Sequence, residues 1–307
     1  MKVLIVVDME GITGIERAES PEKGVELMTA EVLSVVKLLT ALGTNDITIC
    51  DAHDRGENIE RKLFVMEDVQ VVSQVWNVDF IKGYDVALLI GFHGMAGSDS
   101  LSPHTLREDI AKVERNGMEI GEVGILINWL REYNVPTVFV SGDKQATKEA
   151  LMEEPTCVTY TIGRDERLQD VFFQSSNEFA QKVDSLTNNK LRATISQEEL
   201  YVYVKNRDAI SYIRAKDKVR DGYLRFESYS ELLSSMYNIC EDLNNAMNEI
   251  VKKNTDFIMI LRNDFGNIDI QGYKDNLFHH LLSKNVYTLE EPDREYIMKA
   301  LKSILSH

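Results

Sequence analysis

The sequence predicts an α/β fold: a largely parallel central sheet with helices on both faces, plus a smaller α+β C-terminal part. The first observation is a series of short apolar runs, rich in β-branched residues, that are typical of buried strands. The second is that helical patterns separate these runs, because strands that alternate with helices pair in parallel. The third is that this alternation weakens after about residue 160, so the rest of the 307-residue chain is expected to form a separate part.

The first predicted strand and helix follow directly from residue type. Val3–Val7 is a continuous apolar run and predicts a buried strand. Ser20 is a candidate helix cap, and Pro21 suits the first helical position because its missing N–H would have no partner there. Apolar residues then recur at helical spacing: Met28, Val32, Val35 and Leu39. Gly43 suits the end of this helix.

The next elements continue the alternation. Three apolar stretches predict strands at Asp46–Cys50, Val69–Ser73 and Val86–Phe92. The elements expected after them are a helix from Gly121 to Tyr133, a strand at Thr137–Ser141, and a helix capped by Asp143 that runs through Leu151. In the C-terminal part we expect a strand at Tyr201–Lys205 and helices at Ser228–Lys252, Asp275–Leu282 and Pro292–Leu305.

The composition excludes several classes of partner. The formal net charge of −16 repels nucleic-acid phosphates and anionic lipid surfaces, so neither nucleic acid nor a membrane is expected as a partner. The first apolar run ends at Asp8 and is too short for a signal peptide, and no run approaches the roughly 18 apolar residues of a membrane span. The three cysteines are far apart and lack metal-binding spacing. We therefore expect a cytoplasmic protein without a disulfide framework.

Acidic and histidine side chains follow the predicted strands at the point where each strand ends. Asp8 and Glu10 come after the first strand, Asp51 and His53 after the second, and His93 after the fourth. In open α/β sheets, ligands bind at the carboxyl ends of the strands. These side chains are therefore expected to converge on one edge of the sheet.

The residue types at this edge are those of a hard or borderline metal site. Carboxylates and imidazoles without thiolates suit Zn²⁺ or Mn²⁺, and one carboxylate can bridge two ions about 3.5–4 Å apart. Glu122 lies near the start of a predicted helix, where the macrodipole favours a glutamate without any metal. Its spacing therefore leaves a ligand role and a helix-start role both open.

A series of short motifs resembles a known family. In chain order they are VVDMEGITG (6–14), LMTAEV (27–32), DAHDRGEN (51–58), GFHG (91–94), SPHT (102–105), IGEVG (120–124) and SGDKQATKEA (141–150). Over about residues 1–160 the sequence is similar to the D-aminopeptidases of the DppA type, a bacterial and archaeal family of zinc metallopeptidases. The resemblance fades over about residues 160–245 and ends before the segment from about 250 onward.

The resemblance implies a metal site and a reaction. Asp8 corresponds to the carboxylate shared by two zinc ions, and the remaining ligands correspond to Glu10, His53, His93 and Glu122. The implied reaction is hydrolysis of N-terminal peptide bonds in short peptides, in particular D-amino-acid peptides. The family forms a ring-stacked decamer, which implies a large homo-oligomer here.

His104 of the SPHT motif corresponds to the residue to which the family gives the nucleophile role. An imidazole can act near neutral pH either as a nucleophile or as a general base, and the sequence leaves the two roles open.

On this basis the chain divides into three predicted parts. Residues 1–160 form a metal-binding α/β catalytic core, 161–249 a family-like α+β part, and 250–307 a mainly helical extension. In the extension, Ile297, Leu301 and Ile304 share one apolar helical face. This face is expected to pack either on its own subunit or on a neighbouring one.

Two other functions remain open. The family motif usually has a small hydroxyl residue where this chain has Val6, so a non-catalytic assembly or binding protein that keeps the fold is one alternative. A two-metal phosphohydrolase is the other, because it uses the same ligand types. Its anionic substrates favour Arg or Lys beside the metal ligands, and Arg55 is the only base close in sequence to a ligand.

Overall fold

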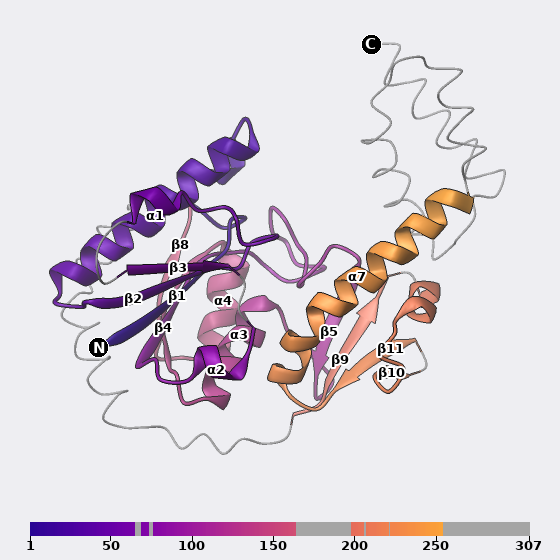
Figure 1. Cartoon of the computed structure of the whole chain (residues 1–307). Coiled ribbons are helices and arrows are strands. Elements are labelled where there is room, and N and C mark those ends of the chain that lie inside the picture. The colour runs from indigo at the N-terminus through magenta and orange to yellow at the C-terminus, as the bar shows by residue number, and fades with distance from the viewer. Residues whose placement is uncertain (65–68, 74–75, 164–197, 206, 221, 254–307) are drawn as a thin grey trace, which may run out of the picture. The chain divides into compact units, whose positions relative to one another are not determined.

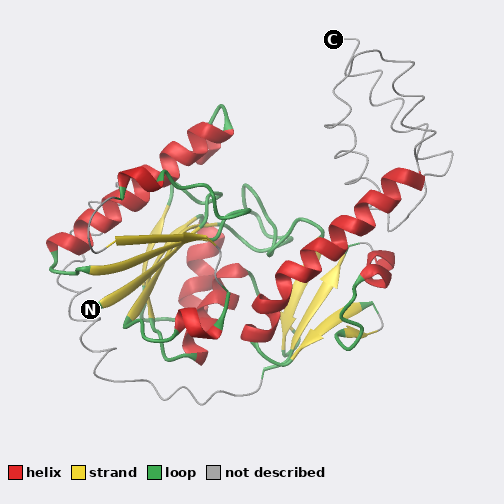
Figure 2. Cartoon of the chain, viewed as in Figure 1, coloured by secondary structure: helices red, strands yellow, loops and turns green. Residues whose placement is uncertain are grey.

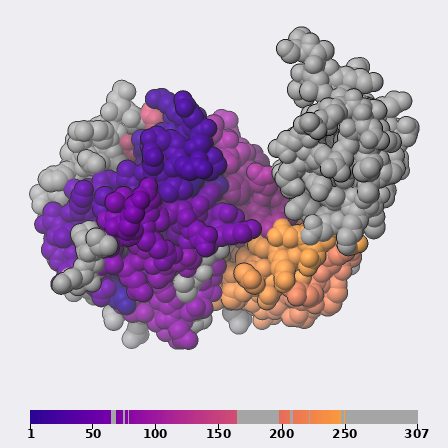
Figure 3. Space-filling view, turned by 45° about the horizontal axis from the view of Figure 1, so that its top comes forward, coloured from indigo at the N-terminus to yellow at the C-terminus, as the bar shows by residue number. Residues whose placement is uncertain are grey.

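The structure is a computed structural model that describes residues 1–64, 69–73, 76–163, 198–205, 207–220 and 222–253 (Figure 1). The chain divides into two compact units, which are described separately. Unit 1 comprises Met1–Leu200 and Phe226–Ser234, and unit 2 comprises Tyr201–Arg225 and continues from Ser235. In the space-filling view, indigo and purple atoms from the N-terminal part of the chain cover much of the visible face of unit 1 (Figure 3).

Unit 1 is built on a six-stranded parallel sheet. Its strands are β1 (Lys2–Val7), β2 (Asp46–Asp51), β3 (Val69–Ser73), β4 (Val86–Phe92), β7 (Thr137–Gly142) and β8 (Val158–Thr161). They lie in the order β3-β2-β1-β4-β7-β8, and every neighbouring pair is parallel. The predicted α/β class is confirmed, and the first five of these strands lie within one residue of their predicted bounds. β8 was not predicted, because its sequence VTYT is short and half polar.

Helices cover both faces of this sheet (Figure 2). α1 (Pro21–Ala41) packs on one face, and α3 (Glu122–Glu132) and α4 (Lys144–Glu153) pack on the other. Ser20 caps α1 and Asp143 caps α4, each by accepting backbone N–H groups of the first turn, as the sequence predicted. Three shorter helices complete unit 1: η1 (Ile15–Arg17), η2 (Arg61–Leu63) and α2 (Val78–Ile81).

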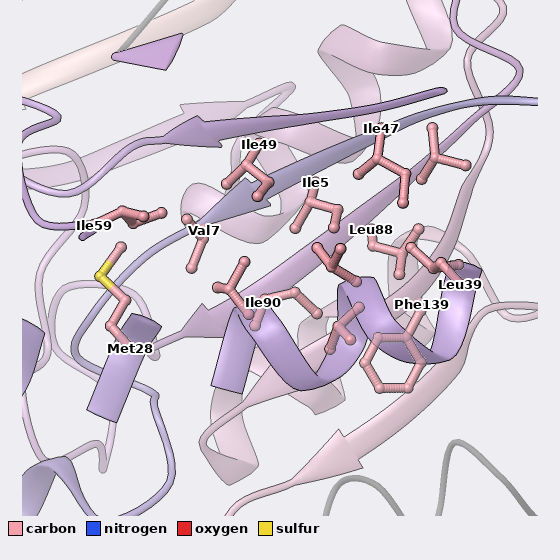
Figure 4. Close-up of a cluster of buried hydrophobic side chains, with 14 of the residues drawn as sticks. Ile5, Val7, Met28, Leu39, Ile47, Ile49, Ile59, Leu88, Ile90 and Phe139 are labelled. Carbon is pink, nitrogen blue, oxygen red and sulfur yellow. The ribbon is translucent and has the colours of Figure 1, made fainter. Parts of the chain in front are cut away.

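The face of the sheet that α1 covers forms a continuous apolar core (Figure 4). Side chains alternate between the two faces along each strand, so Ile5, Ile49 and Leu88 point to the same side. Met28 and Leu39 of α1 pack in this core and are completely buried. Burying a side chain of this size stabilises the fold by about 1.5–3 kcal/mol. The core therefore fixes β1, β2 and β4, whose carboxyl ends carry the polar residues.

The strand order of the sheet reverses at β1. From β1 the chain moves outward through β2 and β3, and it then returns to the other side of β1 as β4. In open α/β sheets, such a reversal of strand order is the place where ligands bind. Asp8 directly follows β1 and His93 directly follows β4, so both lie at this switch point.

The remaining strands are antiparallel where their pairing is described. In unit 1, β5 (Ile110–Arg115) and β6 (Met118–Glu119) form a hairpin whose turn residues Asn116 and Gly117 both have positive φ. Asn-Gly is a strong hairpin signal that the sequence analysis did not use. The other elements are β9 (Leu200–Val204), η3 (Arg207–Tyr212), β10 (Val219–Arg220), β11 (Tyr223–Phe226) and α7 (Tyr229–Lys253).

Among the described residues, no helix has the length and apolar character needed to cross a membrane. The helices predicted at Asp275–Leu282 and Pro292–Leu305 lie outside the described residues. The three-part division at residues 160 and 249 stays a prediction.

Candidate metal centre

Six side chains from five separate segments meet at the carboxyl edge of the six-stranded sheet. They are Asp8 and Glu10 after β1, His53 after β2, His93 after β4, His104 in the following loop, and Glu122 at the start of α3. Their donor atoms form three overlapping groups, and within each group the atoms lie within 4.8 Å of one another. The structure thus brings together every side chain that was predicted for the site.

Asp8 lies at the centre of the cluster. Its Oδ1 lies 3.2 Å from Nδ1 of His53, and its Oδ2 lies 3.5 Å from Nε2 of His93. On the first side, Oε2 of Glu10 lies 2.9 Å from the same His53 nitrogen. On the second side, Oε1 of Glu122 lies 3.3 Å from the same His93 nitrogen. These contacts define two of the three groups. The first consists of Asp8, Glu10 and His53, and the second of Asp8, His93 and Glu122, so Asp8 is the residue that the two groups share.

The hydrogen bonding of His93 leaves the cluster short of donors. Its Nδ1 lies 3.0 Å from the carbonyl oxygen of Gly94, and because a carbonyl can only accept, Nδ1 donates. In the neutral ring, Nε2 then presents a lone pair to two carboxylates. This nitrogen and Oδ2 of Asp8 are both buried without a hydrogen-bond partner. Buried acceptors that face one another require protons or metal ions between them, so the residues present fit a metal site.

His104 faces the same space from the loop after β4. Its ring stacks on the ring of His93, with 4.0 Å between the centroids and 17° between the planes. Its Nδ1 lies 3.2 Å from the carbonyl oxygen of Ser102, so Nδ1 donates and Nε2 is left as the acceptor in the neutral ring. That Nε2 lies 3.9 Å from Glu10 and 3.8 Å from Glu122. These distances exceed those of the other two histidines to their carboxylates.

The three carboxylates shift the pKa values of their neighbours. Burial raises the pKa of Asp8 to about 7, and the nearby charge of Glu10 adds to this shift. Burial alone would lower the pKa of His53, but hydrogen bonds to Asp8 and Glu10 raise it to about 10. Burial would also lower the pKa of His93, but the charge of Glu122 and a hydrogen bond to it raise this pKa to about 10. Burial would raise the pKa values of Glu10 and Glu122, but the neighbouring histidines lower both values below their usual range.

The metal-free protein is expected to lose stability as the pH rises from about 7 to about 10. The raised pKa values of His53 and His93 stabilise the fold fully below the unfolded value near 6.5, and this contribution is lost as the pH passes about 10. In the metal-loaded protein these histidines would be neutral ligands, so its melting temperature should change less over this range. Thermal unfolding of chelated and zinc-loaded protein measures the difference. Equal slopes for the two forms would contradict this charge state.

The loop that carries His53 is fixed by two polar side chains. Asp51, the last residue of β2, accepts the N–H of His53 at 3.3 Å and the N–H of Asn58 at 2.6 Å. The Asn58 amide in turn donates to the His53 carbonyl oxygen at 2.6 Å. The position of Asp51 after the second predicted strand indicated its place at this edge, whereas Asn58 was not among the predicted site residues. The signal available was an asparagine in a turn that also contains a glycine.

The loop that carries His104 is tied to Glu122. The N–H of Leu106 donates to Oε1 of Glu122 at 2.7 Å. Leu106 has a φ of 63°, a left-handed conformation that is unusual for leucine. Such conformations persist where the surrounding structure holds them, often at functional sites. Nothing in the sequence indicated this contact, because a leucine carries no signal for a positive φ.

Val6 occupies the position at which the family motif usually has a hydroxyl residue. Its side chain is buried within β1 and stands in register with Cys50 and Leu89 of the neighbouring strands. The valine therefore contributes packing, and it makes no hydrogen bond to the site through its side chain.

Comparisons with known proteins identify the family of this chain. Residues 1–200 match the profile of the M55 peptidase family, described as D-aminopeptidase. The chain is 25% identical over 173 residues to a D-aminopeptidase of Bacillus subtilis (strain 168), a match that covers 53% of this chain and 63% of that protein. Its fold is similar to that of the Zn-dependent D-aminopeptidase DppA from Bacillus subtilis, described as a self-compartmentalizing protease. That structure gives a TM-score of 0.60 at 20% identity and covers 79% of this chain and 98% of that chain.

Proposed function

Because this chain belongs to the M55 family of D-aminopeptidases, we propose that it is a metal-dependent aminopeptidase. The proposed reaction is hydrolysis of the N-terminal peptide bond of short peptides, with D-amino-acid peptides as the preferred substrates. Asp8, Glu10, His53, His93 and Glu122 would hold two divalent ions, with Asp8 contributing to both ligand groups. The observation that carries this proposal is that the two oxygens of Asp8 face two different ligand groups.

The charges of the cluster support two divalent ions. Asp8, Glu10 and Glu122 contribute three negative charges, and two divalent ions would contribute four positive ones, so one positive charge remains. A small positive excess suits a reaction in which negative charge develops on a carbonyl oxygen. Zinc is the proposed metal because its ligands are imidazoles and carboxylates, and because the similar structure is described as Zn-dependent.

The chain's own residues define an inner and an outer side of the site. The side chains of Asp8 and His93 are 6% and 2% exposed, whereas those of Glu10 and His53 are 21% and 23% exposed. A substrate can therefore approach from the more exposed side, where Glu10 and His53 lie. Bound ions of this kind polarise a carbonyl group and activate water.

His104 is the proposed catalytic group. The carbonyl oxygen of Ser102 holds its Nδ1 hydrogen, so the Nε2 lone pair points to the space beside Glu10 and Glu122. From this position it could attack an acyl carbon as a nucleophile or accept a proton from water as a general base.

Metal analysis combined with a substrate screen tests the proposal. Zinc-loaded protein should contain about two ions per chain and should hydrolyse short D-amino-acid peptides faster than their L-counterparts. Chelation should abolish this activity and added zinc should restore it. If the loaded protein hydrolyses no peptide, the non-catalytic assembly or binding role takes precedence.

The same screen should include phosphate esters, which test the phosphohydrolase alternative. Among the described residues, the ion pairs of the three carboxylates all involve histidines. A site for phosphate would need arginine or lysine beside the metal ligands. We therefore expect no turnover of these esters.

The proposal extends to assembly and location. A homo-oligomer, in the form of a ring-stacked decamer, is supported by the similar structure described as self-compartmentalizing. The mass of the full-length protein in solution measures this directly. A cytoplasmic location is supported by the small number and wide spacing of the cysteines, which give no disulfide framework of the kind that secreted proteins use.

A further inference from the structure

Glu31 is a buried carboxylate on α1 that lies outside the predicted ligand set. It is 8% exposed, and its Oε2 accepts the N–H of Thr13 at 2.9 Å. Thr13 follows Glu10 by three residues, so this hydrogen bond fixes the loop that carries Asp8 and Glu10. Glu31 also interacts with the hydroxyl of Ser141 at the end of β7.

The contact with Ser141 extends the influence of Glu31 to a second strand. The hydroxyl oxygen of Ser141 accepts the N–H of Gly91 at 3.1 Å, and Gly91 lies two residues before His93. Gly91 has a φ of 78°, and a Cβ added to it would lie 2.3 Å from the Asp8 carbonyl oxygen. The ends of β1 and β4 are therefore in close contact where Glu31 is connected to both.

Glu149 holds a similar position on the opposite face of the sheet. It lies on α4, is 6% exposed, and accepts the N–H of Gly121 through Oε1 at 2.5 Å. It also accepts a backbone hydrogen bond from Gly124, so it satisfies two N–H groups in the first turn of α3. Gly121 directly precedes Glu122. A Cβ on Gly121 would lie 2.5 Å from Oε2 of Glu149 and 2.8 Å from Cβ of Met95, so a larger residue would displace the Glu149 carboxylate.

Both carboxylates lie at buried positions, where apolar side chains are more usual. Neighbouring residues of α1, such as Val32 and Val35, are completely buried in the core. A buried carboxyl group is unfavourable unless its hydrogen bonds are needed, and burial raises the pKa of Glu149 to about 7. The backbone groups that these two residues hold belong to segments that carry proposed ligands.

We propose that Glu31 and Glu149 are positioning residues of the metal centre, one from each face of the sheet. Glu31 sets the loop of Asp8 and Glu10, and Glu149 sets the first turn of α3 and with it Glu122. Neither residue is a ligand. This inference rests on the proposed metal site, because positioning has a measurable effect only if a metal binds.

The test compares two replacements at each position. Glu31→Met and Glu149→Met keep the volume of the side chain but remove the hydrogen-bond acceptor, whereas Glu31→Gln and Glu149→Gln keep a carbonyl acceptor. Each methionine variant is expected to bind zinc about 10–100-fold more weakly than the wild type, the usual effect of losing such a supporting contact. Each glutamine variant should stay within about threefold of the wild type, because the acceptor is restored. Zinc affinity is measured by competition with a chromophoric chelator, and Co²⁺ spectra report the ligand geometry.

Two controls separate positioning from general destabilisation. Val36→Ala opens a cavity beside α1, and Thr147→Val removes a buried hydroxyl of α4 that bonds to Thr161. Both should lower the melting temperature and leave zinc affinity unchanged. If a methionine variant does not fold, Glu31→Asp or Glu149→Asp replaces it, since each withdraws the carboxylate by one methylene and should show the same loss.

Each outcome decides one point. Wild-type protein that binds no zinc would overturn the proposed function itself. Wild-type protein that binds zinc, with methionine or aspartate variants that bind it equally well, would overturn the positioning role alone. Equal losses in the Val36→Ala and Thr147→Val controls would also overturn it, because the effect would then follow stability and not position.

Discussion

Replacing Asp8 with alanine is expected to remove both bound metal ions and to lower peptide hydrolysis by about a thousandfold or more. Asp8 belongs to two of the three ligand groups, one with Glu10 and His53 and the other with His93 and Glu122. Its loss therefore leaves each of these two groups with two of its three protein donors. Metal ions supply several kcal/mol of transition-state stabilisation, and about 4 kcal/mol corresponds to a thousandfold in rate. Metal content and kcat/KM of Asp8→Ala measure the effect.

Ligands that belong to only one of these groups should have a smaller effect on metal content than Asp8. His53 belongs to one of the two groups and Glu122 to the other, so His53→Ala and Glu122→Ala should each retain about one ion per chain. Asp242→Ala is a matched control, because Asp242 is also a buried aspartate but pairs with Arg214. It should retain both ions. Two ions in Asp8→Ala would show that the bridging assignment is wrong.

The sheet and most of its ligand positions could be predicted because both depend on local sequence. A continuous run such as Val86–Phe92 has few alternatives to a buried strand, and all seven of its residues are buried. The end of such a run also marks the edge of the sheet, which is why Asp8 and His93 could be assigned to one place from sequence alone. The order of the strands then brings these two residues together at the switch point.

The rest of the site depends on contacts between distant segments, which local patterns do not show. Glu122 reaches the cluster because α3 starts beside it, and that start is fixed by Glu149 of another helix. The sequence alone left a helix-start role for Glu122 equally open, and the structure shows that it has both a helix-start position and a place in the cluster. Glu31 lies in a motif that supported the family resemblance, but its partner Thr13 could be identified only from the fold.

Replacing His104 with alanine is expected to lower kcat by at least about a hundredfold, the lower limit for loss of a general base or nucleophile. Metal content should stay close to that of the wild type, because two of the three ligand groups are complete without His104. Its Nε2 also lies 3.8–3.9 Å from Glu10 and Glu122, beyond hydrogen-bonding distance. Kinetics and metal analysis of the same preparation measure both effects.

The metal content of this variant decides between two roles that the geometry permits. His104 also forms the third ligand group with Glu10 and His93, so it could itself be a ligand of a metal ion. If His104→Ala loses an ion, as expected of His53→Ala, His104 is a ligand and not the catalytic group. If metal is retained and turnover is lost, rapid-mixing kinetics of the wild type distinguish the two catalytic roles. A burst of released product indicates a covalent acyl intermediate on His104 when the burst is absent from the variant, whereas a linear time course in the wild type favours a general base.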